Sequence, residues 1–181
     1  MVAGVACDDL DGGEEIHKGY VAERHGSKPT YQLVEDEAEM CKVAKDFIAG
    51  CVKSGIEPET IAVTYHDESS LTALQSALSQ QGIAAYQWDR GYFKGNVTGV
   101  RYCPLEAMKG RASRAVVVHG VNERHFPATL SVEPVENETD NIDKQMYLRR
   151  MRAYLYVAIT RASDQVLCIG EGLPTSLIRK V

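Results

Sequence analysis

The order of short apolar runs and longer helical segments constrains the fold of this 181-residue chain more than any other feature. Ile61–Tyr65, Ala115–His119 and Gln165–Ile169 are short, mostly apolar runs, which are typical of buried strands. Glu35–Ser54 carries apolar residues at spacings of three and four, which predicts an amphipathic helix, and Ile142–Ala162 predicts a second long helix. Strands that alternate with helices indicate an α/β fold whose mainly parallel sheet carries helices on both faces.

A single domain is expected over residues 30–181, after a loop-rich N-terminal segment at residues 1–29. Sheets of this kind usually bind ligands beyond the carboxyl ends of their strands. The other predicted elements are strands at Tyr31–Val34, Ala84–Trp88 and Gly99–Cys103, a helix capped by Asp67 or Ser69 that ends at Gln81, a loop at residues 121–141 and a terminal helix at Thr175–Lys180.

Composition narrows the class of protein. No apolar run approaches the ~18 residues of a membrane span, and Met1–Cys7 lacks the basic region of a signal peptide. Five scattered cysteines, none in a Cys-x-x-Cys pair, indicate reduced thiols in a cytoplasmic protein. Residues 1–89 carry 6 Lys/Arg and 16 Asp/Glu, a balance of −10, whereas residues 90–181 carry 14 and 9, a balance of +5. Contacts with phosphates would therefore fall in the second half, and the alternative is a solvated surface with uneven charge.

Arg161 stands at the junction of a predicted helix and a predicted strand, within Leu155–Ala162. A guanidinium is always charged and carries a fixed fork of donors, so it suits phosphate oxygens. The alternative is an arginine that extends along apolar surface and binds the last carbonyls of its helix.

A second segment gives this junction a context. Leu105–Gly110, which ends in Lys-Gly, precedes the apolar run Arg114–Gly120, and Phe126–Pro127 follows it. With the Thr-Arg-Ala segment, this order resembles the C-terminal half of the UvrD/Rep family of superfamily 1 DNA helicases. A weaker match at Ile61–Tyr65 resembles the unit that opens the family's second RecA-like domain. The resemblance covers about Thr30 to Gly170, most of the chain.

The resemblance implies the second RecA-like domain of an ATP-dependent DNA helicase or translocase. Arg161 would be the catalytic arginine finger, reaching the γ-phosphate of ATP, with Thr160 and Tyr156 setting the end of its helix. Lys109 and Gly110 match a motif that couples the nucleotide to single-stranded DNA. Arg152 matches a basic position of the same helix, whereas Arg149 and Arg150 are expected on a solvated face.

The Lys-Gly motif departs from the family in several places. The family usually has Thr, a DNA-backbone contact, where Pro104 stands, and His where Glu106 stands. It usually has Leu-Glu-Phe, whose Glu contacts the ribose, where this chain has Arg111–Ser113. Lys109 and Arg111 are then the expected phosphate contacts of the DNA-binding surface, which also includes Pro104. This motif is expected to grip DNA less well than its relatives do.

Parts needed to bind Mg-ATP are missing from the sequence. There is no G-x-x-x-x-G-K-[ST] loop, because Gly26–Lys28 lacks the preceding glycine and Pro29 follows it. No Asp-Glu pair closes an apolar run. The resemblance implies that ATP and Mg²⁺ are bound mainly by a first RecA-like domain that would precede Met1, so the isolated chain is expected to hydrolyse no ATP. The expected partners are that preceding domain and single-stranded DNA, with no membrane.

The segment Asp89–Thr98 stands where larger family members carry a helical insertion, so a compact domain without that insertion is expected. Two other functions remain open. One is a degenerate RecA-like domain that acts as a protein-interaction module, and the other is an unrelated doubly wound domain with a small ligand at its strand ends. An aromatic cluster of Tyr86, Trp88, Tyr92 and Phe93 suits base stacking, although packing at a strand end is the more frequent role.

Overall fold

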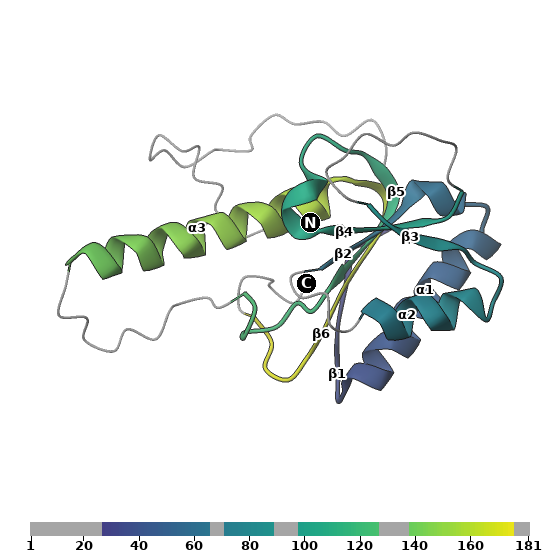
Figure 1. Ribbon diagram of the computed structural model, residues 1–181, viewed down its shortest axis with the longest axis horizontal. Coiled ribbons are helices and arrows are strands. Elements are labelled where there is room, and N and C mark those ends of the chain that lie inside the picture. The colour runs from purple at the N-terminus through teal and green to yellow at the C-terminus, as the bar shows by residue number, and fades with distance from the viewer. Residues whose placement is uncertain (1–26, 66–70, 89–97, 127–137, 176–181) are drawn as a thin grey trace.

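The computed structural model describes four stretches of the chain. The Asp67 or Ser69 cap, Tyr92, Phe93 and most of the expected N-terminal segment and terminal helix lie outside them. Figure 1 shows one α/β unit in these stretches. The described residues are 27–65, 71–88, 98–126 and 138–175.

Six strands form one parallel sheet in the order β1-β6-β5-β2-β4-β3 (Figure 1). The expected α/β fold with a mainly parallel sheet is confirmed. The strands are β1 (Thr30–Val34), β2 (Ile61–Tyr65), β3 (Ala85–Gln87), β4 (Val100–Pro104), β5 (Ser113–His119) and β6 (Ala162–Glu171). The helices are α1 (Glu37–Lys53), α2 (Leu71–Ser79) and α3 (Glu138–Thr160), with two short 3-10 helices, η1 (Pro58–Thr60) and η2 (Leu105–Met108).

Helices cover both faces of the sheet and define two cores. The first core holds α1 and α2, whose Ile48 and Leu74 are fully buried. The second core holds the end of α3 and the short helix η2, through Leu155 and Met108. Neighbouring residues of β5 enter opposite cores, which explains why Ala115–Val118 is a continuous apolar run rather than an alternating one.

Local capping sets the bounds of α1. The Asp36 carboxylate accepts a hydrogen bond from the Glu39 amide at 2.8 Å, and the Glu39 carboxylate accepts one from the Glu35 amide at 2.9 Å. Asp36 is thus the N-cap, so the helix begins two residues after the predicted start. It ends at Lys53, and Gly55 follows with a φ of 89°, a conformation that favours glycine.

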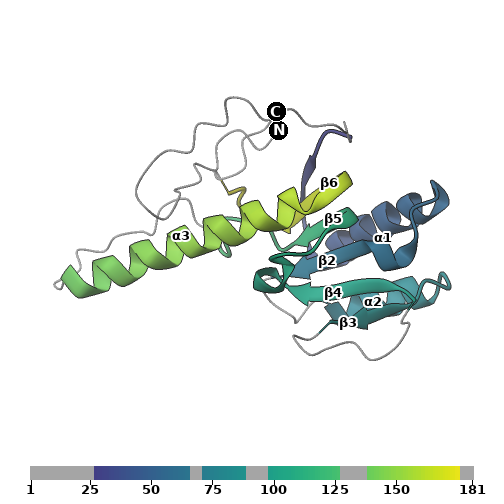
Figure 2. The same cartoon turned by 90° about the horizontal axis from the view of Figure 1, so that it is seen from above.

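The structure also changes the predicted bounds of α3 and β6. Helix α3 begins at Glu138, inside the segment predicted as a loop, and ends at Thr160 rather than Ala162. Strand β6 spans Ala162–Glu171, longer than the predicted run, because it pairs with β1 on one side and β5 on the other. Figures 1 and 2 both show the first half of α3 extending beyond the sheet. There Ile142 and Met146 are 60% and 53% exposed.

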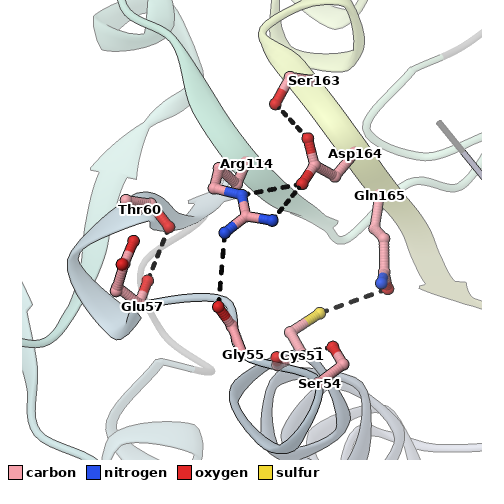
Figure 3. Close-up of polar contacts among 9 residues, drawn as sticks. All are labelled: Cys51, Ser54, Gly55, Glu57, Thr60, Arg114, Ser163, Asp164 and Gln165. Atoms are coloured by element: carbon pink, nitrogen blue, oxygen red, sulfur yellow. Dashed lines mark hydrogen bonds and ion pairs between the residues drawn. The ribbon is translucent and has the colours of Figure 1, made fainter. Parts of the chain in front are cut away.

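The described cysteines are free thiols, as the composition predicts. Cys51, Cys103 and Cys168 are buried, and burial raises the pKa of Cys51 and Cys103 to about 11. The Cys51 thiol donates to the side-chain oxygen of Gln165 at 3.4 Å (Figure 3). None of the described helices is long and apolar enough to cross a membrane.

Candidate functional site

Arg161 occupies the turn between α3 and β6. The Thr160 hydroxyl donates to the carbonyls of Tyr156 and Val157, at 2.9 and 3.1 Å, and so binds the last turn of α3. The Arg161 carbonyl accepts a hydrogen bond from the Ser113 amide at 2.9 Å, at the start of β5. The backbone of Arg161 is therefore fixed from two sides, by its own helix and by the neighbouring strand.

The side chain of Arg161 lacks a partner in the described part of the chain. The residue is half-buried, and its Nε is buried without a hydrogen-bond partner there. Arg114 offers a contrast at the same edge, because it pairs with the Asp164 carboxylate at 2.7 Å and donates to the Gly55 carbonyl at 3.4 Å (Figure 3). A buried donor without a partner is costly. Arg161 thus keeps one buried donor without a partner among the described residues, whereas Arg114 is paired.

The Lys109–Gly110 turn lies beside this junction. Leu105 and Met108 of η2 are buried beneath α3, which leaves Lys109 and Gly110 exposed. Gly110 adopts a φ of 76°, which glycine accommodates without strain. Because Ser113 bonds to Arg161, the structure brings both predicted motifs to one edge of the sheet. This edge holds the amino ends of β5 and β6, opposite to the edge where sheets of this class usually bind ligands.

Pro104 and Lys109 stand at the two ends of the short helix η2. Pro104 closes β4 and pairs in register with Tyr65, at the carboxyl ends of the strands. Lys109 and Arg111 lie beyond η2, near the start of β5.

Trp88 stacks against an arginine. The guanidinium carbon of Arg111 lies 3.3 Å from the centroid of the Trp88 ring, and that of Arg101 lies 5.6 Å away. Trp88 is only 8% exposed and packs in the second core, so its ring is not an open surface for base stacking. Tyr86 is half-buried beside that core. Both described aromatic residues of this cluster therefore pack in or against the second core.

Arg101, in β4, is not among the site residues predicted from the sequence. Its guanidinium donates to the Ser113 hydroxyl at 3.0 Å and to the Ala112 carbonyl at 3.4 Å. It thereby holds the segment that follows Arg111. The sequence could have indicated the position of Arg101, because residues two positions apart in a strand point to the same face. Arg101 therefore shares the face of β4 that carries the buried Cys103.

The other basic residues of α3 and the two described histidines differ in their surroundings. Arg149 and Arg150 are exposed, as expected, and Arg152 is half-buried. His119 is buried at the end of β5, and its burial lowers its pKa to about 4. The His125 ring lies 2.9 Å from the Gly120 carbonyl. Among the described residues, no His, Cys, Asp or Glu cluster is arranged to hold a metal ion.

A shallow cavity of about 600 Å³ lies at the carboxyl ends of β1, β5 and β6. Three carboxylates line it, from Glu35, Glu123 and Glu171, with Arg124 as the basic member. Phosphates would be repelled by this charge balance. The carboxyl edge of the sheet, where an unrelated doubly wound domain would bind a small ligand, is therefore unsuited to a nucleotide.

Comparison with solved structures identifies the fold. The C-terminal domain of a possible DNA helicase from Lactobacillus plantarum WCFS1 is similar, with a TM-score of 0.60, 18% identity, and coverage of 84% of this chain and 80% of that chain. At this identity the likeness shows the fold alone, which is the RecA-like α/β fold. S. tokodaii Xpd4 matches with a TM-score of 0.40 at 12% identity, over 89% of this chain and 37% of that chain, and carries no argument. No family model and no curated protein matches the chain.

Proposed function

We propose that this chain is the second RecA-like domain of an ATP-dependent DNA helicase or translocase of the UvrD/Rep type. The observation that carries the proposal is the Arg161 guanidinium, half-buried and without a partner among the described residues. It stands beside the Lys109–Gly110 turn, joined to it through the Ser113–Arg161 hydrogen bond. The RecA-like fold, shared with a domain described as part of a possible DNA helicase, supports the same function.

Arg161 would act as an arginine finger. Phosphoryl transfer depends on positioning and on stabilising the charge of the transferred group rather than on a reactive side chain. A guanidinium that pairs with no carboxylate among the described residues is suited to that charge, and Thr160 fixes the helix end that carries it. Mg²⁺ and most of the ATP contacts would come from a preceding RecA-like domain, with Lys109 and Gly110 contributing from this one.

Mutation of Arg161 tests this role in a protein that contains both RecA-like domains. Arg161→Ala is expected to reduce ATP turnover by ~10³ or more. Arg161→Lys should also fail, because a point charge does not replace the planar fork. Arg114→Ala is the matched control, since Arg114 is already paired with Asp164 at the same edge. An Arg161→Ala variant that keeps most of its turnover, with an unchanged melting profile, would show that the assignment is wrong.

Single-stranded DNA is the proposed substrate of the exposed basic turn. Lys109 and Arg111 are exposed and precede β5, whereas Lys42 and Lys45 lie on α1, at the other face of the sheet. Reversing the charge of Lys109 and Arg111 should lower both the affinity and its dependence on salt, because fewer counterions are released. Reversal at Lys42 and Lys45 should change neither. Fluorescence anisotropy over a salt series measures both quantities, and equal losses from the two pairs would mean non-specific attraction.

A second candidate function is a RecA-like module that binds a protein. Exposed apolar residues on α3 favour it, since Ile142, Met146 and Tyr147 are 60%, 53% and 39% exposed. The departures at Pro104, Glu106 and Ala112 favour it as well. Under this function Arg161→Ala would leave every activity of the protein unchanged, whereas Ile142→Asp would abolish the interaction.

A further inference from the structure

The contact between Arg111 and Trp88 is not explained by the proposed DNA contacts of Lys109 and Arg111. The guanidinium carbon of Arg111 lies over the Trp88 ring, 3.3 Å from its centroid. Trp88 itself is held by the hydrogen bond of its amide to the Tyr102 carbonyl and by burial in the second core. The ring is therefore a fixed support for an otherwise flexible side chain.

Arg111 remains exposed although one face of its guanidinium is covered. Among the described residues no ion pair involves Arg111, and no hydrogen bond of its guanidinium is found. A stacked guanidinium still presents the edges that carry its N–H donors. Since the planar fork is already ordered, it loses less entropy on binding than a free side chain would.

The guanidinium of Arg101 adds a second positive charge beside the Trp88 ring. Arg101 lies 5.6 Å from the same ring centroid and is tied to Ser113 and Ala112, so it cannot easily move away. Two fixed cations beside one ring favour an anionic ligand. The planar fork selects phosphate or carboxylate oxygens, and phosphodiesters are the anions that the proposed function brings to this surface.

We propose that Trp88 is a positioning residue that holds the Arg111 guanidinium ready to bind a phosphodiester of single-stranded DNA. The inference rests on the proposed function and adds to it a support that lies outside the Lys-Gly motif. It also accounts for Arg111, where the resemblance leads one to expect Leu. Trp88 acts only through Arg111 and makes no contact with DNA.

The chain contains a single tryptophan, so its fluorescence reports on this stack alone. Titration of the chain with a thymidine oligonucleotide is expected to change the Trp88 emission in a saturable manner. Arg111→Gln should alter the emission of the free protein and should remove the response to DNA. Pyrophosphate serves as the second probe, because it distinguishes binding of an isolated phosphate group from binding of a DNA strand.

A double-mutant cycle in DNA affinity tests the positioning role, with anisotropy of a labelled oligonucleotide as the measurement. Trp88→Leu is expected to weaken binding about threefold to tenfold, the scale of a cation–π contact. Trp88→Phe should restore part of that loss, because it keeps a ring. When Arg111 is already Gln, Trp88→Leu should cause no further loss. Lys109→Gln is the control, because no cation–π contact joins Lys109 to Trp88 among the described residues. The fold losses of DNA affinity caused by Lys109→Gln and Trp88→Leu should therefore multiply in the double variant.

Independent effects of Trp88→Leu and Arg111→Gln would overturn the proposal, because Trp88 would then act by general stability. Unchanged DNA affinity in Arg111→Gln, or no DNA binding by the chain, would overturn it as well. A tighter response to pyrophosphate than to the oligonucleotide would transfer the site from DNA to a free phosphate ligand. The proposed function is tested separately by the ATP turnover of Arg161 variants, which does not depend on Trp88.

Discussion

Gly170 is the position at which a single methyl group should do most damage to the sheet. A Cβ built at Gly170, in β6, would meet the backbone of Val121, with the carbonyl carbon at 2.6 Å and the carbonyl oxygen closer still. The contact is with backbone rather than with a movable side chain. Val121 is also tied to β6 by a hydrogen bond from its amide to the Ile169 carbonyl at 2.9 Å. Gly170→Ala must therefore displace the chain that follows β5.

The expected cost follows from that overlap. Forcing an extra methyl group into a packed site costs about 1–3 kcal/mol. Gly50 provides a matched control, because it lies in α1 and nothing stands within 4 Å of its Cβ position. There the same substitution should stabilise the protein by about 0.5–1 kcal/mol, since alanine loses less backbone entropy in a helix.

Urea unfolding followed by circular dichroism measures both free energies, and thermal melting gives a second reading. At about 2–4 °C per kcal/mol for a domain of this size, the melting temperature should fall by about 2–12 °C for Gly170→Ala. It should rise by about 1–4 °C for Gly50→Ala. If Gly170→Ala matches the wild-type protein while Gly50→Ala behaves as expected, the close approach of Val121 to β6 is wrong.

Two further predictions concern the cores. Burial lowers the pKa of His119 to about 4, and an unfolded histidine titrates at about 6.5, so the unfolded chain binds the extra proton between these values. The free energy of unfolding should therefore fall by an amount on the order of 3 kcal/mol as the pH drops from about 6.5 to about 4. His119→Gln should abolish this pH dependence, which urea unfolding at several pH values measures. Leu155→Ala, at a fully buried site, should cost about 2–5 kcal/mol. Ile142→Ala, on the exposed part of the same helix, should stay within about 0.5 kcal/mol of the wild-type protein, and similar losses for both would contradict the assigned second core.

The class of fold was predictable because its signal is local. All five residues of Ile61–Tyr65 are buried, and a strand that is covered on both faces reads as a continuous apolar run. Helix α1 was equally predictable, since one face carries its buried residues and Asp36 and Gly55 mark its limits. The order of the strands was not predictable, because no local pattern states which strands become neighbours.

The candidate site was predictable in part. Arg161 and the Lys109–Gly110 turn were identified from their motifs, but their meeting depends on β5 and β6 being adjacent, which is a non-local property. The absence of a partner for the Arg161 Nε among the described residues depends on three-dimensional packing. The stack of Arg111 on Trp88 likewise requires η2 to cross the face of the sheet, and spacing in the sequence gives no sign of it.

The strand order has a consequence for how the protein is made. Strand β1 is synthesised before the other described strands, yet its only partner in the sheet is β6, the last of them. A growing chain can pair β2, β4 and β5 among themselves, while β1 must wait about 130 residues for its neighbour. Until β6 has emerged, the backbone N–H and C=O groups on one edge of the apolar strand β5 lack partners and can pair with other chains. Slower translation through Glu138–Glu171 should therefore lengthen the time during which nascent chains need a chaperone.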